Sequence, residues 1–444
     1  MLLEFSVANF RSIGEEQTLY MQPAFKSKDE DHNILETGIR REPQALPVVA
    51  ILGANASGKS NILKAMSFLK EILSDSASRQ KNDLYDDYRF KLNAEYKEKP
   101  TSFNIKFLDR DSQEDTSYIL EYELTLLPSK IVKEKLSSVS SIKGARKKTL
   151  IDRSEKKISL HSSIYRKKNF LEVWKADINN QQTALAYLGN KGEIDIFNPV
   201  LYWFRNYNFI SPTTEPTFFT SGYVEDGIIN KAEILNLLNS VDINIEDLNI
   251  LPRESILPQE LNDTFDSLLA KTIEHYDIEE SIIYEYKQLR AEFIHTSTSG
   301  HNILFDLQKD ESEGTKTLYA ISGRIILSLT LGSPLAVDEL DSSLHPYLIR
   351  KIIQLFTNKK TNPKGAQLIF TTHDVTVMDK SLLRPDEIYF TEKDKETFET
   401  KLYSLAEFKG MGSVSKNDRG EKLYKDYLNG RFGAVPEVDW EGGI

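Results

Sequence analysis

Short apolar runs and one long helical repeat mark the first part of the chain. The apolar positions favour strands near residues 2–7 and 17–21. Residues 47–52 form a continuous apolar run rich in β-branched side chains, which is typical of a buried parallel strand. A glycine-containing turn follows, and from Asn61 onward apolar residues recur with the spacing of a helix. These helical positions are Ile62, Ala65, Met66, Leu69 and Ile72.

Alternating positions come next, and continuous apolar runs return later in the chain. Residues 102–107 and 118–126 alternate between apolar and polar, which predicts an antiparallel hairpin at the edge of the core. Residues 333–337 and 367–370 are again short and mostly apolar, as in the buried strands of a parallel sheet. The sequence therefore predicts an α/β fold with a parallel sheet and an antiparallel β subdomain.

The stretch from about residue 130 to 300 has a different pattern. It is predicted to be mostly helical, and Ile234, Leu237 and Leu238 share one face of one such helix. Residues 282–289 give a second example. Because no heptad pattern is sustained, we expect a compact helical insertion rather than a long coiled-coil arm.

Residues 53–60 carry the first chemical motif. They read Gly-Ala-Asn-Ala-Ser-Gly-Lys-Ser and fit the pattern G-x-x-x-x-G-K-[ST] between a predicted strand and a predicted helix. In such a loop, backbone N–H groups and the helix dipole cradle a phosphate, the lysine neutralises β- and γ-phosphate charge, and the last serine binds Mg²⁺. An ordinary glycine turn is the alternative. The candidate ATP-binding residues are Asn55, Ala56, Ser57, Gly58, Lys59, Ser60 and Asn61.

Two carboxylates follow the apolar run at 333–337. Asp338 and Glu339 are therefore expected at the end of a strand. Phosphoryl transfer needs one group that holds Mg²⁺ and another that polarises the attacking water. We therefore assign Ser60 and Asp338 as the Mg²⁺ ligands and Glu339 as the catalytic residue. The alternative is a strand that ends in a solvated acidic turn.

A histidine follows the run at 367–370. Ligands of open α/β sheets gather at the carboxyl ends of strands, so His373 is placed to reach the γ-phosphate as a catalytic residue. The alternative is a histidine that caps a turn.

Ser312 and Gly314 precede an amphipathic helix. A serine and a glycine at a helix N-terminus form an anion site. A simple N-cap explains Ser312 equally well, and both interpretations stay open. The apolar face of the helix carries Leu318, Ile321, Ile325 and Leu329.

Composition narrows the class of protein. The chain is 444 residues long, with 40% apolar and 28% charged residues, which indicates a folded protein with a sizeable core. The absence of cysteine excludes disulfides, cysteine-bound zinc and thiol catalysis. No secretory leader pattern and no apolar run of ~20 residues is present. We therefore expect a cytoplasmic protein that makes no membrane contact.

The net charge of −11 argues against chain-wide attraction to nucleic acid. A local basic stretch between residues 143 and 168 nevertheless offers a nucleic-acid interface, for which a solvated loop is the alternative. The stretch contains Lys143, Arg146, Lys147, Lys148, Arg153, Lys156, Lys157, Arg166, Lys167 and Lys168.

The order of these motifs resembles the ABC-type ATPase heads of the SMC, RecF and OLD proteins. It also resembles the bacterial proteins labelled AAA family ATPases in the OLD-like group, and the resemblance covers nearly the whole chain. The matching segments are Asn9-Phe10-Arg11-Ser12 and residues 311–315, 338–346 and 427–436. The resemblance implies an ABC-type P-loop ATPase head that uses ATP and Mg²⁺.

The resemblance also implies roles for individual residues. Ser312 and Gly314 would stand at the signature motif, which contacts the γ-phosphate bound by the other protomer, so a homodimer of heads or a higher homo-oligomer is expected. Asp341 would lie in the D-loop, and His373 would be the switch histidine. Arg11 would lie near the adenine or the α-phosphate.

Two features depart from the family pattern. The signature lacks the leading leucine and double glycine of transporters, so a transporter ATPase is poorly supported. Tyr88-Arg89-Phe90 stands where a Q-loop glutamine is expected. Three parts are expected: the N-terminal half of the head at 1–130, the helical insertion at 131–300 and the C-terminal half of the head at 301–444.

Relatives in the OLD-like group are often ATPase subunits of two-gene anti-phage systems such as PARIS. The resemblance therefore implies an ATP-hydrolysing sensor or scaffold that controls a separate nuclease or toxin effector encoded nearby, with a phage protein as the trigger. The sequence shows no nuclease constellation of its own. The alternative is a RecF- or SMC-like DNA repair ATPase that binds duplex DNA through the basic stretch.

Overall fold

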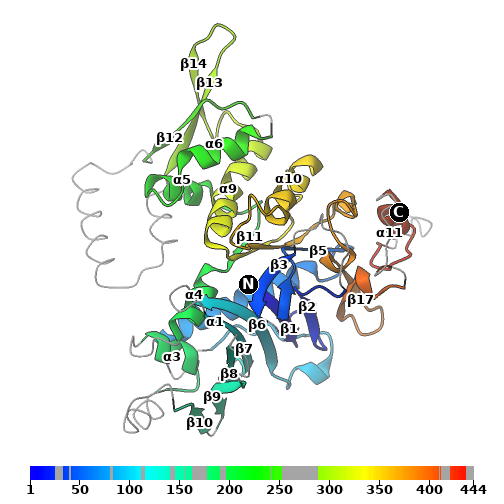
Figure 1. Cartoon of the computed structure of the whole chain (residues 1–444). Coiled ribbons are helices and arrows are strands. Elements are labelled where there is room, and N and C mark those ends of the chain that lie inside the picture. The colour runs from blue at the N-terminus through cyan, green and yellow to red at the C-terminus, as the bar shows by residue number, and fades with distance from the viewer. Residues whose placement is uncertain are drawn as a thin grey trace. The chain divides into compact units, whose positions relative to one another are not determined.

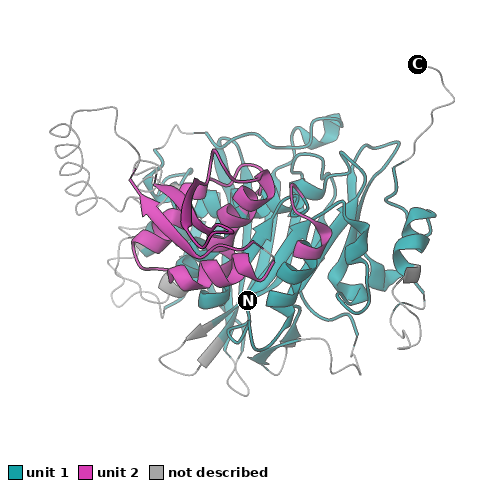
Figure 2. Cartoon of the chain, turned by 90° about the horizontal axis from the view of Figure 1, so that it is seen from above, with its two compact units in different colours: residues 1–209, 328–341, 349–444 teal, residues 210–327, 342–348 magenta. Residues whose placement is uncertain are grey.

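The computed structural model divides into two compact units (Figure 2). Unit 1 comprises residues 1–209, 328–341 and 349–444, and unit 2 comprises residues 210–327 and 342–348. Within the described residues, no helix is both long enough and apolar enough to cross a membrane. The structure describes residues 1–25, 34–39, 42–80, 84–111, 116–140, 146–155, 157–162, 178–190, 197–241, 243–252, 289–409, 411 and 421–436.

An antiparallel sheet of seven strands forms one layer of unit 1 (Figure 1). Its order is β10-β9-β8-β7-β6-β1-β2, and every neighbouring pair is antiparallel. Phe5, Phe107 and Leu124 are among the side chains that it buries. The strands are β1 (Leu2–Ala8), β2 (Gln17–Tyr20), β6 (Thr101–Asp111), β7 (Thr116–Leu127), β8 (Lys130–Ser140), β9 (Lys148–Ser154) and β10 (Lys157–Leu160).

The hairpin expected at 102–107 and 118–126 is present as β6 and β7, but it lies in the middle of this sheet rather than at an edge. The sheet continues through β8, β9 and β10, so most of the described residues from 130 to 160 are strand and not part of a helical insertion. Glu134 explains the difference. It occupies a fully buried position of β8, and a charged residue there interrupts the apolar alternation by which a strand is recognised.

Glu134 is a buried polar centre of unit 1. Its carboxylate accepts the backbone N–H groups of Ala184 (2.7 Å) and Leu185 (2.9 Å) and the hydroxyl of Tyr122 (3.1 Å). The guanidinium of Arg153 lies 3.7 Å away and is also buried. A buried charge is tolerated when it is paired and hydrogen-bonded, and these contacts attach the helix that begins at Ala184 to the sheet.

A second sheet of unit 1 carries the parallel strands. Its order is β11-β15-β16-β5-β17-β18, in which β15, β16, β5 and β17 are parallel and β18 is antiparallel to β17. Every residue of β5, β15 and β16 is buried, which confirms the three strands expected from continuous apolar runs. The strands are β5 (Val48–Gly53), β11 (Asn208–Ile210), β15 (Pro334–Val337), β16 (Gln367–Thr371), β17 (Ile388–Lys393) and β18 (Thr400–Ser404), and β3 (Leu35–Ile39) pairs separately with β4 (Glu42–Ala45).

Helix α1 (Lys59–Asp75) is the central helix of unit 1. Its residues from Ile62 to Leu73 are buried on most sides, so the helix belongs inside the core and not on its surface. The other helices of unit 1 are α3 (Ala184–Asn190), α4 (Asn198–Asn206) and α11 (Glu421–Leu428), and short 3₁₀ helices lie at Ser76–Ser78, Ala94–Tyr96, Val375–Val377, Pro385–Glu387 and Leu405–Glu407.

Unit 2 is built on a three-stranded antiparallel sheet of order β12-β13-β14. The helix expected around Ile234 and Leu238 is present as α6, and both side chains are buried. The helix expected at 282–289 lies outside the described residues apart from Leu289. The elements of unit 2 are α5 (Thr217–Glu225), α6 (Lys231–Asn239), β12 (Asp247–Leu251), β13 (Arg290–Thr296) and β14 (Asn302–Asp306), while α9 (Glu313–Leu331) and α10 (Pro346–Thr357) each run across a unit boundary.

Candidate functional site

Three neighbouring parallel strands of unit 1 bring the predicted motifs to one edge of the sheet. β5 lies next to β16, and β16 lies next to β15. Because Thr371 of β16 pairs with Ile51 of β5, the two strands end at nearly the same level. The glycine-rich loop follows β5, Asp338 follows β15 and His373 follows β16. Ligands of open parallel sheets bind at such carboxyl ends.

Two glycines shape the loop between β5 and α1. Gly58 is the N-cap of α1 with φ of 105° and ψ of 11°, a left-handed conformation that strains other residues. A Cβ atom on Gly58 would lie 2.1 Å from Oγ1 of Thr400, and one on Gly53 would lie 2.4 Å from the carbonyl oxygen of Thr391. The loop therefore has no room for a side chain at either position. The backbone N–H groups that begin α1 favour an anion here.

Lys59, the first residue of α1, folds back over the loop. Its Nζ donates hydrogen bonds to the carbonyl oxygens of Gly53 (2.9 Å) and Ala54 (3.1 Å). The side chain is only 6% exposed. Asn55 and Ala56 are exposed at the tip of the loop, where Ala56 has a positive φ of 61°. The loop thus forms a backbone cradle with one lysine across it.

Carboxylates surround this lysine at longer range. Burial lowers the pKa of Lys59, whereas the carboxylates of Glu339, Asp341 and Asp338 act to raise it. Charges interact more strongly where water is partly excluded, so these groups bias the lysine towards its charged form. The structure therefore brings together four residues that sequence analysis selected from two separate motifs.

Hydroxyl groups from distant parts of the chain brace the loop. Oγ of Ser12 and Oγ1 of Thr400 are 2.7 Å apart, and the amide of Asn61 donates to Ser12 (2.7 Å). Thr400 also donates to the carbonyl of Ser57 (2.8 Å), whose hydroxyl lies 2.6 Å from that of Thr391. The side chains of Asn61 and Ser57, selected as ligand-binding residues, therefore support the loop itself. Neither threonine belongs to a recognised motif, so sequence analysis missed both.

The turn at residues 9–14 exposes Arg11 next to Ser12, which belongs to this hydroxyl network. Asn9 and Arg11 have positive φ angles of 52° and 53°. The buried side chain of Asn9 accepts the backbone N–H of Phe90 (2.9 Å), which fixes the turn. The exposed guanidinium of Arg11 lies over the ring of Tyr88, 4.5 Å from its centre. Tyr88 stands where a glutamine was expected, and it supports Arg11 through a cation–π contact.

Thr371 holds the two carboxylate residues at the end of β15. Its Oγ1 donates to Oδ1 of Asp338 (2.7 Å) and accepts the backbone N–H of Glu339 (2.7 Å). Asp338 is buried, whereas Glu339 is exposed and has a φ of 58°. This left-handed conformation costs about 1 kcal/mol and persists where the surroundings impose it. One carboxylate is thus fixed at the strand end, and the next is displayed beyond it.

One buried carboxylate and one hydroxyl are available to a divalent cation. Asp338 is fixed by Thr371, and Ser60 is the second residue of α1, where it is half-buried. Among the described residues, no three acidic or histidine side chains gather as a group that could hold a metal. Mg²⁺ commonly takes one or two carboxylates and completes its shell with phosphate oxygens and water. Ser60 and Asp338 therefore fit a magnesium ion that arrives with a nucleotide.

Asp341 contacts the segment after β16. Its Oδ2 accepts the backbone N–H of His373 (3.2 Å), whereas its buried Oδ1 has no hydrogen-bond partner within the described part of the chain. The side chain of His373 is exposed. Asp341 therefore fixes the backbone that carries His373 and retains an oxygen that can accept a further hydrogen bond.

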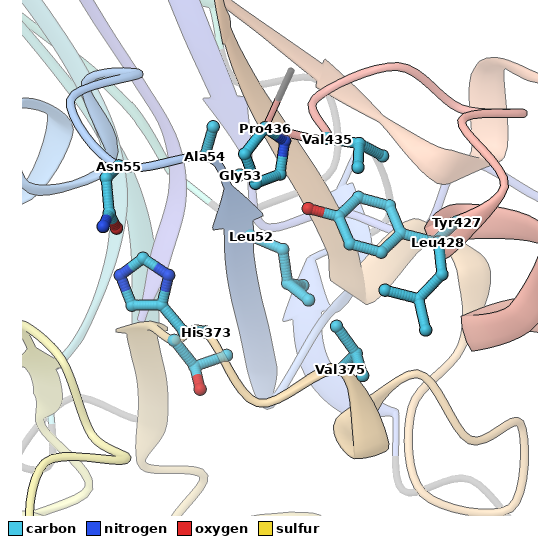
Figure 3. Close-up of a pocket in the computed structure, with 11 residues that line it drawn as sticks. Leu52, Gly53, Ala54, Asn55, His373, Val375, Tyr427, Leu428, Val435 and Pro436 are labelled. Carbon is cyan, nitrogen blue, oxygen red and sulfur yellow. The ribbon is translucent and has the colours of Figure 1, made fainter. Parts of the chain in front are cut away.

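A cavity of about 490 Å³ lies beside the glycine-rich loop. Figure 3 shows Asn55 and His373 on one side of it, opposite Tyr427 and Val435. The hydroxyl of Tyr427 donates to the carbonyl of Ala434 (3.0 Å), which holds the C-terminal segment in place. The tail that sequence analysis recognised without a role thus forms a wall of this cavity. Its lining residues are Leu52, Gly53, Ala54, Asn55, Thr372, His373, Val375, Tyr427, Leu428, Val435 and Pro436.

Ser312 and Gly314 belong to unit 2, whereas the other predicted site residues belong to unit 1. Ser312 is exposed, and its Oγ accepts the backbone N–H of Thr315 (3.2 Å), so it is the N-cap of α9. A Cβ atom on Gly314 would lie 3.1 Å from the carbonyl oxygen of Ser343, so the helix end packs closely against that backbone. The expected capping contact is therefore present, and the first N–H groups of α9 lie beside an exposed serine.

A family model described as "AAA domain, putative AbiEii toxin, Type IV TA system" matches residues 48–379. The match spans the glycine-rich loop, Asp338, Glu339 and His373. No curated protein matches the chain.

Several solved structures resemble the chain at low identity. One is the SMC head domain from Thermotoga maritima, at 13% identity and a TM-score of 0.38, with 91% of this chain and 98% of that chain covered. A second is an Smc head domain with a coiled coil and joint from Pyrococcus yayanosii, at 12% identity and a TM-score of 0.38, covering 96% and 99%. A third is a dimeric ATP-binding cassette bound to ADP and Pi, at 11% identity and a TM-score of 0.26, covering 91% and 100%.

Replacing Lys59 tests the loop directly. Lys59→Ala is expected to weaken ATP binding by about 100-fold, because charge-assisted contacts to phosphate are lost. Its fold should persist, since the amine contacts loop carbonyls and not the apolar core. Lys64→Ala is the matched control on the same helix and should bind normally. Nucleotide titration with circular dichroism measures both, and equal affinity for wild type and Lys59→Ala would contradict the assignment.

Proposed function

We propose that this chain, which belongs to the AAA domain family whose model matches residues 48–379, binds and hydrolyses ATP. The observation that carries this proposal is the convergence of three loops at the ends of β5, β15 and β16. They supply a backbone cradle with Lys59, a pair of consecutive carboxylates and a histidine. These are the parts that phosphoryl transfer requires of a protein.

Each residue has a distinct task in the proposed reaction. The N–H groups at the start of α1 bind the β-phosphate, and Lys59 neutralises charge on the β- and γ-phosphates. Ser60 and Asp338 hold Mg²⁺, which would neutralise charge on the phosphates. Glu339 polarises the attacking water, and its display beyond the buried strand suits that role. His373 orients the γ-phosphate, and its backbone is held by Asp341.

The proposed active state is a pair of heads with ATP between them. Ser312 and Gly314 mark the N-terminus of α9, where N–H groups and the helix dipole favour an anion. In the proposal they contact the γ-phosphate held by Lys59 of the other protomer. Oδ1 of Asp341, which has no hydrogen-bond partner among the described residues, can accept a hydrogen bond that forms when the two heads close on each other. Arg11, displayed on Tyr88, would lie beside the base or the α-phosphate. Higher homo-oligomers remain compatible with this pairing.

For the biological role, we propose a sensor or scaffold subunit of a bacterial defence system against phage. Its ATP cycle would hold and release a separate nuclease or toxin effector after a phage protein acts as the trigger. Support comes from the OLD-like pattern of the motifs and from the family description, which refers to a toxin of a type IV toxin–antitoxin system. The sequence contains no nuclease constellation, so cutting is assigned to the partner.

A DNA repair ATPase of the SMC or RecF kind is the second candidate. Arg146 and Lys148 of the basic stretch are exposed, as a DNA contact needs. Lys147, however, is paired with Glu121, and Arg153 is buried and donates to backbone carbonyls, so Arg153 is unavailable to DNA. Duplex binding that falls steeply with salt and is lost in Arg146→Ala/Lys148→Ala would favour this candidate. Of the remaining basic residues, Lys157 is exposed on β10, whereas Lys143, Lys156, Arg166, Lys167 and Lys168 lie outside the described residues.

Mixing two inactive variants tests whether the site is shared between protomers. Lys59→Ala should be inactive at ATP concentrations that saturate wild type, because it binds ATP about 100-fold more weakly, and Ser312→Arg should bind ATP but fail to hydrolyse it. A heterodimer of the two contains one intact composite site, so an equal mixture should recover about one quarter of wild-type turnover. ATP hydrolysis measured for each variant and for the mixture gives the answer. Normal turnover by Ser312→Arg alone would show that this serine is not part of the site.

The effector proposal makes a separate prediction in cells. The chain expressed alone should be non-toxic and should leave DNA and RNA intact. Expressed with the product of the neighbouring gene, it should form a complex that purifies together and acts only after a trigger. The Lys59→Ala variant is the control for dependence on ATP. Degradation of nucleic acid by the purified chain, abolished by a substitution in this chain, would refute the assignment of cutting to a partner.

A further inference from the structure

The turn that leads from β14 into α9 is closed by its own hydrogen bonds. The backbone N–H of Asp310 donates to the carbonyl of Asp306 (2.8 Å), and the backbone N–H of Asp306 donates to the carboxylate of Asp310 (2.8 Å). Oδ1 of Asp306 also accepts the backbone N–H of Gln308 (2.9 Å). Glu311 is the first residue beyond this closed turn, and Ser312 follows it. The position of Ser312 therefore depends on how this turn and Glu311 are held.

Glu311 is held by a histidine from the middle strand of the sheet in unit 2 (Figure 1). Nε2 of His295 lies 2.7 Å from Oε1 of Glu311, and Nδ1 lies 2.9 Å from the carbonyl oxygen of Asn244. Both partners are acceptors, so both contacts are hydrogen bonds when each ring nitrogen carries a proton. The ring also packs on Phe305, with 4.7 Å between centres.

This contact is shielded from water. The side chain of Glu311 is 9% exposed and that of His295 is 24% exposed. Charge-assisted hydrogen bonds are short and strong, and they gain further where solvent is partly excluded. The strand that carries His295 is paired on both sides, with β12 and with β14. Glu311 is thus tied to the middle strand of the sheet. The turn before it is attached separately, through the backbone N–H of Leu307 to the carbonyl of Ala291 (3.1 Å) and the amide of Gln308 to the hydroxyl of Thr217 (2.9 Å).

We infer that His295 is a positioning residue for the signature serine: through Glu311 it fixes the backbone that presents Ser312 to the ATP of the other protomer. This inference rests on the proposed function. Ser312 is then held from both sides, because its Oγ caps α9 through Thr315 and its carbonyl accepts the backbone N–H of Lys316 (3.0 Å). A residue that presents a phosphate contact must keep its place to within a fraction of an ångström during turnover.

A structural role and a positioning role predict different results. All the residues proposed to bind ATP within one protomer belong to unit 1, whereas His295, Glu311 and Ser312 belong to unit 2. Loss of positioning should therefore lower turnover and leave ATP affinity unchanged. A pair that only stabilises the fold would change the melting temperature and leave the turnover of the folded protein unaltered.

Substitution of His295 separates these roles. His295→Phe keeps a ring against Phe305 but removes both hydrogen bonds, so the turnover rate should fall by about 10- to 100-fold at unchanged ATP affinity. His295→Gln retains a side-chain donor for Glu311 and should recover most of the rate. His301→Phe, an exposed histidine beyond the same strand, is the matched control and should match wild type. Steady-state hydrolysis, nucleotide titration and thermal melting are measured for each.

A double-mutant cycle assigns the effect to the pair. If His295 acts through Glu311, then His295→Phe in a Glu311→Gln background should cost much less than in wild type. Wild-type turnover in folded His295→Phe, beside a Ser312→Arg variant that is inactive, would overturn the inference and leave the proposed function intact. If Ser312→Arg is itself active, the proposed function fails first. Should His295→Phe not fold, His295→Ala takes its place in the same cycle, and an additive pair or an equal loss of ATP affinity contradicts positioning.

Discussion

The parallel pairing of β15, β16 and β5 is the constraint on which the site depends. Their shared register brings the loop around Lys59, the carboxylates after β15 and the segment with His373 together at the ends of three fully buried strands. The amine of Lys59 is buried against loop carbonyls, and the carboxylates of Asp338 and Glu339 interact with it electrostatically. Together these groups set the local charge at the site. A phosphate that enters this edge meets positive charge and N–H groups together.

The loop does not hold this shape by local sequence alone. Ser12 near the start of the chain and Thr400 near its end hydrogen-bond to each other across it, and Thr400 leaves room only for glycine at position 58. Asn61 joins the same network from α1. The cradle is therefore braced by the turn between β1 and β2, by α1 and by the start of β18. Nucleotide binding is accordingly expected to report on the folding of the whole unit.

Sequence reasoning succeeded where one local pattern determines the outcome, as in the strand, glycine loop and helix around Lys59. It failed where a contact between distant segments overrides the pattern. Glu134 takes an inward strand position because Arg153 and two backbone N–H groups compensate its charge, and alternation alone does not reveal that. Thr400 and His295 were missed for a related reason: each contacts a motif that does not adjoin it in sequence, and neither lies in a motif of its own.

The central claim is that ATP closes two heads on each other, with groups from units 1 and 2 of different protomers at each site. Glu339→Gln tests it most directly, since it preserves the shape of the side chain and removes the carboxylate that polarises water, which commonly costs ~10²–10⁴ in rate. The variant should trap the closed state. Size-exclusion chromatography with light scattering should show a doubled mass with ATP and not with ADP. Undiminished turnover, or a mass indifferent to nucleotide, would contradict the account.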